Sequence, residues 1–415
     1  MDRKALLEVI YDQKNMRWSS DYLSRAASLN LTTGNQIEVI SGIRRSGKST
    51  VLNEIRFMNE EKDYYMNFDD DRLLHFKVDD FQLLYELFIE LFGEQKTFYF
   101  DEIQNIEGWE RFVRRLHDYG NKIYITGSNA RLLSYELGTH LTGRYTANEL
   151  FPFSFHEYLK TNKITVSEDI IFTTAGKATL KKHFFEYMAN GGFPEYLKNK
   201  STEYLKSLYE SILYRDVLVR NKLVSENEMR ELVFFLSSNL ARPVTFNSLS
   251  KSIGVKNAST VKNYLQFLEN SYLIFQIGKF DYSVRKQMFN PKKVYFIDNA
   301  LVSRMGFHFS EDKGRFLENM VFLELKRRGF EVFYHKGQKE CDFILREGKK
   351  ITSAIQVSVS LNDTKTRERE ITGVREAMDA YQLTAGLILT EDGEETITTN
   401  NGTVDVLPVW KWLLT

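Results

Sequence analysis

The stretch Gly42-Ile43-Arg44-Arg45-Ser46-Gly47-Lys48-Ser49-Thr50 fits the phosphate-loop pattern G-x-x-x-x-G-K-[ST] at every fixed position. Residues 37–40 predict a short strand that enters this loop, and residues 49–59 predict a helix that leaves it. Gly42 and Gly47 let the backbone curl so that successive N–H groups point inward, and the helix N-terminus adds positive potential. We therefore expect this loop to bind the phosphate groups of a nucleotide.

Two residues of the loop have chemical roles that follow from their side chains. Lys48 can reach the β- and γ-phosphates of ATP, and the Ser49 hydroxyl can ligate Mg²⁺. The other members of the expected ATP-binding set are Gly42, Arg44, Arg45, Ser46, Gly47 and Thr50. A glycine-rich turn without a ligand is the alternative interpretation, and the strand–loop–helix context disfavours it.

An acidic pair ends the second decisive segment, residues 97–102. Four strand-forming residues lead into Asp101 and Glu102, and a buried strand carries such a pair only at its C-terminal end, where a parallel sheet opens onto its ligand. Asp101 is expected to hold Mg²⁺ through water, and Glu102 is expected to orient and deprotonate an attacking water molecule. A strand followed by an acidic helix cap is the alternative, which the upstream phosphate loop disfavours.

The order of elements predicts an α/β fold for residues 1–159. A helical pattern over residues 3–29 leads into five strand-like segments that are joined by short helical connections. Such an alternation gives a parallel sheet with right-handed crossovers. Residues 160–240 then show a mainly helical pattern.

Residues 241–300 predict a winged helix. A short helix over residues 246–253 and a second helix over residues 257–265 are followed by a strand over residues 272–276. The second helix takes the place of a recognition helix, and its Ser, Thr, Asn and Lys residues suit contacts with phosphates and base edges. Winged helices also serve protein contacts, so a protein partner is the alternative to DNA.

Charge is unevenly distributed, although the whole chain has a formal net charge of zero. Residues 60–118 contain 16 acidic and 7 basic residues, whereas residues 242–293 contain 9 basic and 2 acidic residues. A basic segment of this kind indicates a nucleic-acid surface. We therefore expect DNA to bind through residues 242–293, with a solvated basic face as the alternative.

Composition narrows the class of protein. The 415 residues include 42% hydrophobic residues and only 5 prolines, which is typical of ordered domains. Cys341 is the single cysteine, so an intramolecular disulfide is excluded and the reducing cytoplasm is the expected compartment. No apolar run approaches the ~20 residues of a membrane span, so we expect no membrane partner.

The C-terminal region, residues 301–415, predicts a second α/β unit. Its strand-like segments and main helix are residues 330–335, 340–346, 353–361 and 367–381. Strand alternation places Glu340 and Asp342 on one face of the second of these segments. Cys341 and Phe343 are then expected on the opposite face.

Five motifs together resemble one large prokaryotic ATPase family: Gly42 to Thr50, Asp101-Glu102, Thr126-Gly127-Ser128, Gly143-Arg144 and Gly191-Gly192-Phe193-Pro194. Its members join an AAA-type core to a winged helix and a C-terminal domain of unknown function with a restriction-endonuclease-like fold. The resemblance covers nearly the whole chain. It implies four parts: an AAA-type ATPase core with a leading helix at 1–159, a helical lid at 160–240, a winged helix at 241–300 and a restriction-endonuclease-like domain at 301–415.

The resemblance also implies roles for three polar residues of the core. Thr126 and Ser128 both lie where such ATPases place sensor 1, a side chain that positions the lytic water, and the sequence does not choose between them. Arg144 precedes the fifth strand, where AAA-type proteins place an arginine finger that acts on a neighbouring subunit. A homo-oligomer is therefore expected, and an ordinary surface arginine or a structural ion pair is the alternative for Arg144.

An active nuclease of the restriction-endonuclease-like fold carries an acid, then an Asp, then Glu/Gln-x-Lys. Glu318, Asp342 and Gln356 match this pattern, but Ser358 stands at the lysine position. A serine has no positive charge with which to stabilise the charge that builds on a phosphate. The resemblance therefore implies a degenerate nuclease site, and the alternatives are solvated surface acids or a replacement lysine from residues 336–339.

The motifs as a whole predict an ATPase that requires Mg²⁺ and whose hydrolysis cycle moves or gates the C-terminal half of the chain on DNA. Two alternatives differ in class. One is a nuclease regulated by ATP, and the other is a protein-interaction module that ATP switches without DNA.

Overall fold

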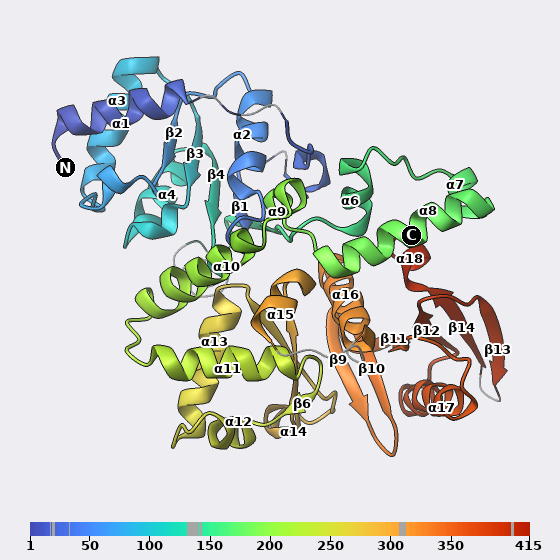
Figure 1. Ribbon diagram of the computed structural model, residues 1–415. Helices are drawn as coiled ribbons and strands as arrows, with labels where there is room; N and C mark the ends of the chain where they lie inside the picture. Colours follow the sequence, from blue (N-terminus) through green and yellow to red (C-terminus); the bar gives the residue numbers. More distant parts are fainter. Residues whose placement is uncertain are drawn as a thin grey trace. The chain divides into compact units, whose positions relative to one another are not determined.

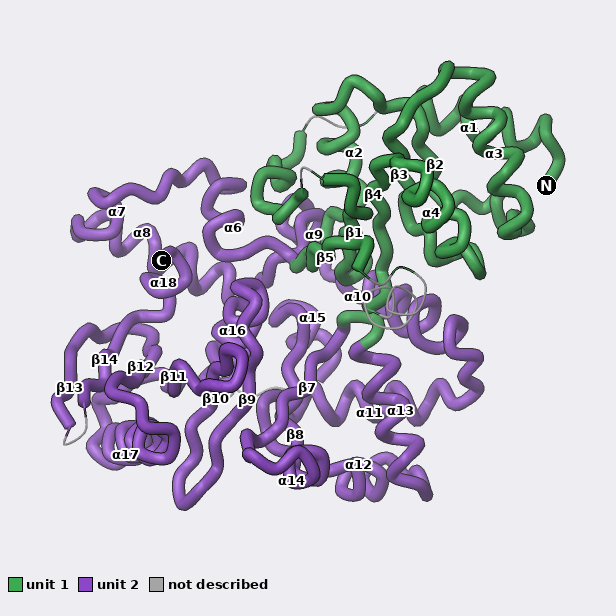
Figure 2. Tube along the Cα trace, turned by 180° about the vertical axis from the view of Figure 1, so that it is seen from behind, with its two compact units in different colours: residues 1–151, 270–272 green, residues 152–269, 273–415 purple. Residues whose placement is uncertain are grey.

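The computed structural model describes residues 1–16, 18, 21–32, 34–130, 141, 143–306, 313–399 and 402–415. The chain forms two compact units (Figure 2). The first unit consists of residues 1–151 with residues 270–272, and the second unit consists of residues 152–269 with residues 273–415. Within the described part of the chain, no helix has both the length and the apolar character that crossing a membrane requires.

A five-stranded parallel sheet forms the centre of the first unit (Figure 1). Its strands are β1 (Ile37–Ser41), β2 (Tyr65–Asn67), β3 (Thr97–Asp101), β4 (Lys122–Gly127) and β5 (Tyr145–Glu149). Their order in the sheet is β2-β3-β4-β1-β5, so β4 separates the strand of the phosphate loop from the strand of the acidic pair. The parallel α/β core predicted from the sequence is confirmed.

The helical elements of the first unit are α1 (Arg3–Asn15), η1 (Ala26–Ser28), α2 (Lys48–Met58), η2 (Asp71–Leu73), α3 (Asp80–Phe92), η3 (Ile103–Asn105) and α4 (Trp109–Asp118). Many of the rings in the core are phenylalanines, and Phe81 of α3 stacks on Phe112 of α4 at 4.5 Å between centroids. Of the helical pattern expected over residues 3–29, the described residues form α1 and the short 3-10 helix η1, and residues 21–25 between them are not helical. The reason lies in α2, because the Glu54 carboxylate there accepts hydrogen bonds from the N–H groups of Arg25 and Ala26.

The second unit begins with a run of helices, as the pattern over residues 160–240 predicts. They are α6 (Phe155–Thr161), α7 (Glu168–Phe172), α8 (Thr174–Asn190), α9 (Pro194–Asn199), α10 (Thr202–Ser211), the π-helix η5 (Ile212–Val219) and α11 (Glu226–Ser238).

The Gly191-Gly192 turn between α8 and α9 is held by a buried carboxylate. Asp298 accepts hydrogen bonds from the N–H groups of Gly192, Ala300 and Leu301, at 2.7, 2.9 and 3.3 Å. Burial raises the pKa of Asp298 to about 6, and these backbone hydrogen bonds oppose that shift. A Cβ atom at position 191 would lie 2.2 Å from the Asp298 carboxylate oxygens, and Gly191 also has a φ of +64°, so only glycine fits there.

Three helices and a small antiparallel sheet follow in residues 243–296. The elements are β6 (Pro243–Val244), α12 (Phe246–Ser252), α13 (Ala258–Asn270), β7 (Ile274–Gly278), α14 (Val284–Phe289) and β8 (Lys292–Phe296), and the sheet order is β6-β8-β7. Helices α12 and α13 lie where the sequence predicts helices, although α13 continues to Asn270, and α14 was not predicted. The strand expected from residue 272 begins at Ile274 instead, because Tyr272 has a left-handed φ of +62° that ends the extended backbone.

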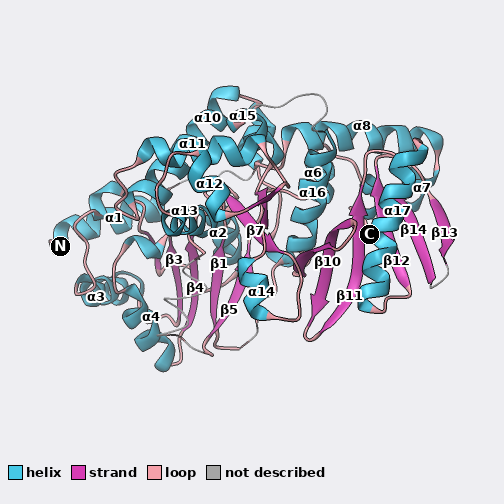
Figure 3. Ribbon diagram, turned by 90° about the horizontal axis from the view of Figure 1, so that it is seen from below, coloured by secondary structure: helices cyan, strands magenta, loops and turns pink. Residues whose placement is uncertain are grey.

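A mixed six-stranded sheet completes the second unit (Figure 3). Helices α15 (Asn299–Met305) and α16 (Lys313–Arg327) precede it, and its strands are β9 (Glu331–Lys336), β10 (Glu340–Glu347), β11 (Lys350–Val357), β12 (Ala385–Thr390), β13 (Glu395–Thr399) and β14 (Gly402–Pro408). The order is β13-β14-β12-β11-β10-β9. Helix α17 (Thr364–Tyr381) covers one face through Val374, Ala377 and Met378, and α18 (Val409–Trp412) follows β14.

An irregularity in β10 corrects one prediction from strand alternation. The register with β9 shifts between Cys341 and Ile344, and these two residues both pack in the core against α17. Phe343 therefore does not share a face with Cys341, and its ring instead lies 5.7 Å from that of Tyr295. The expected placement of Cys341 opposite Asp342 stands, but the expectation for Phe343 is wrong because a bulge adds a residue to the repeat.

Candidate functional site

The phosphate loop links the end of β1 to the start of α2, and its backbone has the unusual conformations that its sequence predicts. Gly42, Arg45 and Gly47 have φ values of +150°, +67° and +101°. A Cβ atom at position 42 would lie 2.2 Å from the Leu150 carbonyl oxygen, so this site requires glycine. Alternating conformations of this kind turn successive N–H groups toward one point, where an anion can bind.

Lys48 lies at the centre of the loop, and its side chain is 3% exposed. Its Nζ donates to the Ile43 carbonyl oxygen at 3.1 Å and lies 3.4 Å from Oε1 of Glu102. The structure therefore brings together the lysine of the first motif and the second acid of the other motif. They are distant in sequence and meet because β1 and β3 both end at the same edge of the sheet.

Asp101 is fully buried at the end of β3 and accepts several hydrogen bonds. The hydroxyl groups of Ser49 and Thr126 both donate to its Oδ1, the first at 3.1 Å, and Tyr65 donates to its Oδ2 at 3.4 Å. Burial, together with the charge of Glu102, raises the pKa of Asp101 to about 6. The hydrogen bonds from Thr126 and Ser49 and the charge of Lys48 oppose this shift.

Glu102 has a left-handed φ of +51°, which carries its side chain away from the line of β3. Its N–H donates to the Thr126 hydroxyl at 2.9 Å, and its carboxylate accepts a hydrogen bond from the Gln104 amide. Burial acts to raise the pKa of Glu102, but Lys48, Gln104 and Arg44 together hold it below its ordinary value. The carboxylate is therefore ionised at neutral pH.

The two sensor 1 candidates take different positions in this site. Thr126 contacts Asp101 and the backbone of Glu102 directly. Ser128 is also buried, its hydroxyl accepts from the Gln104 amide at 3.5 Å, and it helps to lower the pKa of Glu102. Gln104 is a site residue that the motif search did not single out, although its place two residues after the acidic pair is the kind of signal that could have indicated it.

A second missed residue is Arg25, which comes from the segment before β1. Its guanidinium donates to the Ser46 carbonyl oxygen and to the Phe151 carbonyl oxygen, both at 3.1 Å. Arg25 therefore joins the phosphate loop, at Ser46, to the segment that follows β5, at Phe151. No local pattern indicates this role, because the contact depends on segments that are far apart in sequence.

The remaining candidates of the loop are peripheral to this cluster. Arg44 is partly buried and lies 3.7 Å from Oδ2 of Asp69. Arg45 is exposed, and Thr50 is half-buried in the first turn of α2. Ser46 has a buried hydroxyl with no hydrogen-bond partner among the described residues. This unsatisfied donor, with the inward N–H groups and Lys48, fits a bound phosphate, and Ser49 with Asp101 fits its Mg²⁺.

Arg144 is not brought to this site. Its Nε lies 3.3 Å from Oδ1 of Asp118 at the end of α4. The next residue, Tyr145, pairs with Ile37 at the start of β1, whereas the phosphate loop follows the end of that strand. Arg144 therefore lies at the opposite edge of the sheet from Glu102 of the same chain.

The sheet order and the residues at its carboxyl edge define the first unit as an AAA-type P-loop core. Residues 34–159 match a family model described as an AAA domain, and residues 181–312 match a domain of unknown function, DUF8612. An uncharacterized protein of Methanocaldococcus jannaschii is 34% identical over 437 residues, which cover 100% of this chain and 96% of that protein. The chain therefore belongs to the same family of AAA-domain proteins.

Three further comparisons are more distant. An uncharacterized protein of Haemophilus influenzae is 31% identical over 76% of this chain and 80% of its own length. Cdc6p from Pyrobaculum aerophilum superposes with a TM-score of 0.24 and 14% identity, over 65% of this chain and 87% of that one. The McrB AAA+ hexamers of Thermococcus gammatolerans with bound McrC give a TM-score of 0.20 and 11% identity, over 44% and 47%.

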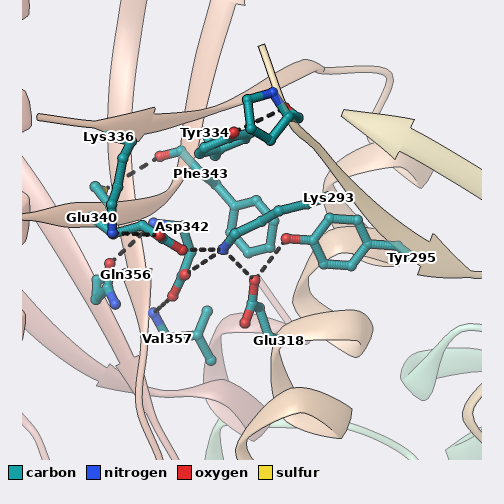
Figure 4. A network of polar contacts seen from close by, with 12 residues as sticks. Lys293, Tyr295, Glu318, Tyr334, Lys336, Glu340, Asp342, Phe343, Gln356 and Val357 are labelled. Atoms are coloured by element: carbon teal, nitrogen blue, oxygen red, sulfur yellow. Dashed lines mark hydrogen bonds and ion pairs between the residues drawn. The ribbon is translucent and has the colours of Figure 1, made fainter. Parts of the chain in front are cut away.

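A second polar cluster lies in the second unit, around the buried ammonium group of Lys293 in β8 (Figure 4). Its Nζ lies 2.9 Å from Oδ1 of Asp342, 3.0 Å from Oε1 of Glu318 and 2.9 Å from Oε1 of Glu340. Burial acts to lower the pKa of Lys293, but the charges of Asp342 and Glu318 hold it well above its ordinary value. The ammonium group therefore stays charged.

The structure brings Glu318 and Asp342 together, as the nuclease-like pattern predicts. Burial and the charge of Asp342 raise the pKa of Glu318 to about 7, and the Tyr295 hydroxyl donates to Glu318 at 2.6 Å. Gln356 accepts from the Asp342 N–H at 3.0 Å and donates to Glu370 of α17 at 2.6 Å. Among the described residues, its hydrogen bond to the cluster is this one with the backbone of Asp342.

Neither Ser358 nor the lysines of the β9–β10 turn takes the central position. The Ser358 hydroxyl donates to the Ser360 carbonyl oxygen at 3.2 Å. Lys336 lies 3.0 Å from Oε2 of Glu340, and the backbone N–H of Lys339 donates to Glu376 at 2.8 Å. Lys293 lies in none of the sequence motifs. The two adjacent lysines that begin the otherwise apolar strand β8 are nevertheless a usable signal, because alternation turns one of them inward.

We predict that Lys293→Met lowers the free energy of unfolding of the second unit by about 3–5 kcal/mol, because it leaves three carboxylates around an apolar side chain. The measurement is the midpoint of urea unfolding, followed by far-UV circular dichroism. Lys292→Met is the matched control, since Lys292 lies in the same strand and its ammonium group donates to the Gln287 carbonyl oxygen at 2.7 Å. Equal midpoints for the two variants would contradict the assignment of Lys293 as the cation that neutralises this cluster.

Proposed function

We propose that this chain binds ATP with Mg²⁺ and hydrolyses it, and that its nucleotide state controls the second unit on duplex DNA. The observation that carries the proposal is the convergence of Lys48, Ser49, Asp101 and Glu102 at the carboxyl edge of one parallel sheet. Membership of a family with an AAA domain supports the same conclusion.

Each residue of the site has a role that follows from its position. The loop N–H groups and Lys48 would bind the phosphates, and Ser49 and Asp101 would hold Mg²⁺. Bound Mg²⁺ neutralises charge on the phosphate oxygens. Glu102 accepts the proton of the attacking water, and its depressed pKa keeps it in the form that accepts one. Thr126 is proposed to fix both acids, which leaves Ser128 as the better candidate for sensor 1.

The proposal of DNA as the partner rests on residues 242–293. Helix α13 buries Val261 and Leu265 and exposes Ser259 and Lys262, so its polar face is free to contact phosphates. A surface hollow of about 540 Å³ lies beside it and is lined by Lys251 and Lys256, among other residues. These positive charges support a winged helix that binds the backbone of duplex DNA.

A protein partner is the second candidate, and the segment between β7 and β8 favours it. Four large apolar side chains in this segment are exposed: Tyr282 by 78%, Val284 by 70%, Met288 by 62% and Phe289 by 79%. Exposed apolar side chains that are close together on a soluble protein often mark a surface that binds another protein. Such a surface would suit the apolar groove or face of another protein.

DNA cleavage is the alternative that the second cluster disfavours. Lys293 is 1% exposed and each of its three close partners is a carboxylate of this chain. An ammonium group held in this way is not available to a phosphate, and it lies where the carboxylates converge. We therefore propose that residues 301–415 serve as a docking or structural domain that does not cut DNA.

The first test of ATP hydrolysis is Glu102→Gln, which keeps the shape of the side chain and removes the base. We expect nucleotide binding to remain and turnover to fall by roughly 10²–10⁴-fold, the usual contribution of a general base. Phosphate release and binding of a fluorescent ATP analogue are measured in parallel. Glu107→Gln, an exposed position in the next turn, is the control and should hydrolyse ATP at the normal rate. Full activity in Glu102→Gln would refute the role of Glu102.

The second test addresses Arg144, which we propose acts on the nucleotide of a neighbouring copy. We expect Arg144→Ala to lose roughly 10³-fold in turnover, the contribution of an arginine finger. Mixing it with Glu102→Gln should restore part of the activity, because some interfaces then combine an intact Arg144 with an intact Glu102. Arg114→Ala is the control, since Arg114 also pairs with Asp118. Activity per molecule that is the same across a range where sedimentation shows only monomers would exclude the role in trans.

The third test separates DNA from protein as the partner. Binding of a fluorescent duplex is measured at several salt concentrations, and ATP turnover is measured with and without that duplex. We expect the affinity to fall as salt rises, and Lys262→Ala to reduce the slope of log affinity against log salt by about 1. Lys349→Ala, an exposed lysine far along the chain, is the control. Absence of binding at low salt would leave the protein partner, and cleavage of the duplex would restore the nuclease alternative.

A further inference from the structure

Residues 270–272 pack with the first unit, although the residues on both sides of them belong to the second. The carbonyl oxygen of Asn270 accepts a hydrogen bond from the N–H of Ala130 at 2.8 Å. The hydroxyl of Tyr272 donates to Oγ of Ser41 at 2.8 Å, and Tyr272 is only 2% exposed. The first and last residues of this three-residue segment are therefore each fixed by a hydrogen bond, one with Ala130 and one with Ser41.

The two partners lie beside the candidate nucleotide site. Ser41 is the last residue of β1 and directly precedes Gly42 of the phosphate loop, and its own carbonyl oxygen accepts from the Leu150 N–H at 2.7 Å. Ala130 comes two residues after Ser128, in the segment that leaves β4. The contacts of residues 270–272 therefore reach the ends of both strands that present the loop and the sensor 1 candidates.

Residues 270–272 are joined to regular secondary structure on both sides with almost no intervening loop. Helix α13 ends at Asn270, and β7 starts at Ile274, so only Leu273 separates Tyr272 from the strand. The N–H of Leu273 donates back to the Leu268 carbonyl oxygen at 3.1 Å. Tyr272 also has a left-handed φ of +62°, a strained conformation for an aromatic residue that persists where its surroundings fix it. The contacts with Ser41 and Ala130 are therefore joined to α13 directly and to β7 through one residue.

We propose that residues 270–272 are the link through which nucleotide at the phosphate loop changes the candidate recognition helix α13. Tyr272 is then a positioning residue, which acts on the loop through Ser41. The proposal rests on nucleotide binding at the site described above, and it holds whether the partner of the second unit is DNA or protein. It predicts that the coupling depends on one hydroxyl pair, in addition to the packing of the tyrosine ring.

The test uses the full-length Glu102→Gln protein, in which bound ATP is consumed roughly 10²–10⁴-fold more slowly. Hydrogen exchange of residues 258–278 is compared with and without Mg²⁺-ATP. We expect ATP to change the exchange rates of this stretch by about fivefold or more, and Tyr272→Phe to remove most of that change, because one hydrogen bond accounts for about a fivefold shift in an equilibrium. Tyr264→Phe is the matched control, since Tyr264 is also buried in α13 but donates to Glu228 at 2.6 Å.

A second variant approaches the same hydrogen bond from the other side. Ser41→Ala removes the acceptor and should reproduce the effect of Tyr272→Phe, and the two changes together should have no more effect than either alone. An ATP-dependent change that is equal in the parent protein and in Tyr272→Phe would overturn the link. So would ATP binding without any change in residues 258–278. Failure of ATP to bind the parent protein would overturn the proposed function of the site as well, so the two failures are distinguishable.

Discussion

The first unit depends on the neutralisation of a buried acidic pair. Asp101 is buried and Glu102 is largely buried, and two adjacent carboxylates in such a place are unstable without a cation and donors. Lys48 supplies the cation, and Ser49, Thr126 and Gln104 supply donors. Because these residues come from β1, β3, β4 and the segments that follow them, the strand order β2-β3-β4-β1-β5 is a condition for the cluster. The strand order therefore brings the cation and the donors to the acidic pair, and without them the buried pair would destabilise the sheet.

Much of this was predictable from sequence because the relevant patterns are local. The phosphate loop, the strand that ends in Asp101 and the alternation of strands with helices each occupy a short stretch, and a parallel sheet brings the ends of its strands to one edge. The pairing of Glu318 with Asp342 came from the family resemblance and not from strand geometry, and in the structure both carboxylates lie beside Nζ of Lys293. Strand alternation predicts the wrong face where a bulge inserts an extra residue into a strand. The bulge in β10 does this, and it moves Phe343 off the face that alternation assigns to it.

The parts that the sequence did not reveal are contacts between segments that lie far apart in the chain. Arg25 supports Ser46 across the loop, Tyr272 bonds to Ser41 over 231 positions, and Lys293 reaches Asp342 from another sheet. Each of these residue types is common, and none lies in a recognisable motif. Their importance comes from tertiary packing, and of the three only Lys293 had a local sequence signal, the pair of lysines that begins β8.

The two buried lysines differ in how fully their N–H groups are satisfied, and this difference separates their roles. An ammonium group has three donors. Lys293 has a carboxylate oxygen at 2.9–3.0 Å for each of them, so a further anion would have to displace a charged partner. Lys48 has one carbonyl oxygen at 3.1 Å and one carboxylate at 3.4 Å, so it keeps donor capacity for an incoming phosphate. The geometry of Lys48 is that of a binding residue, whereas the geometry of Lys293 is that of a permanent counter-ion.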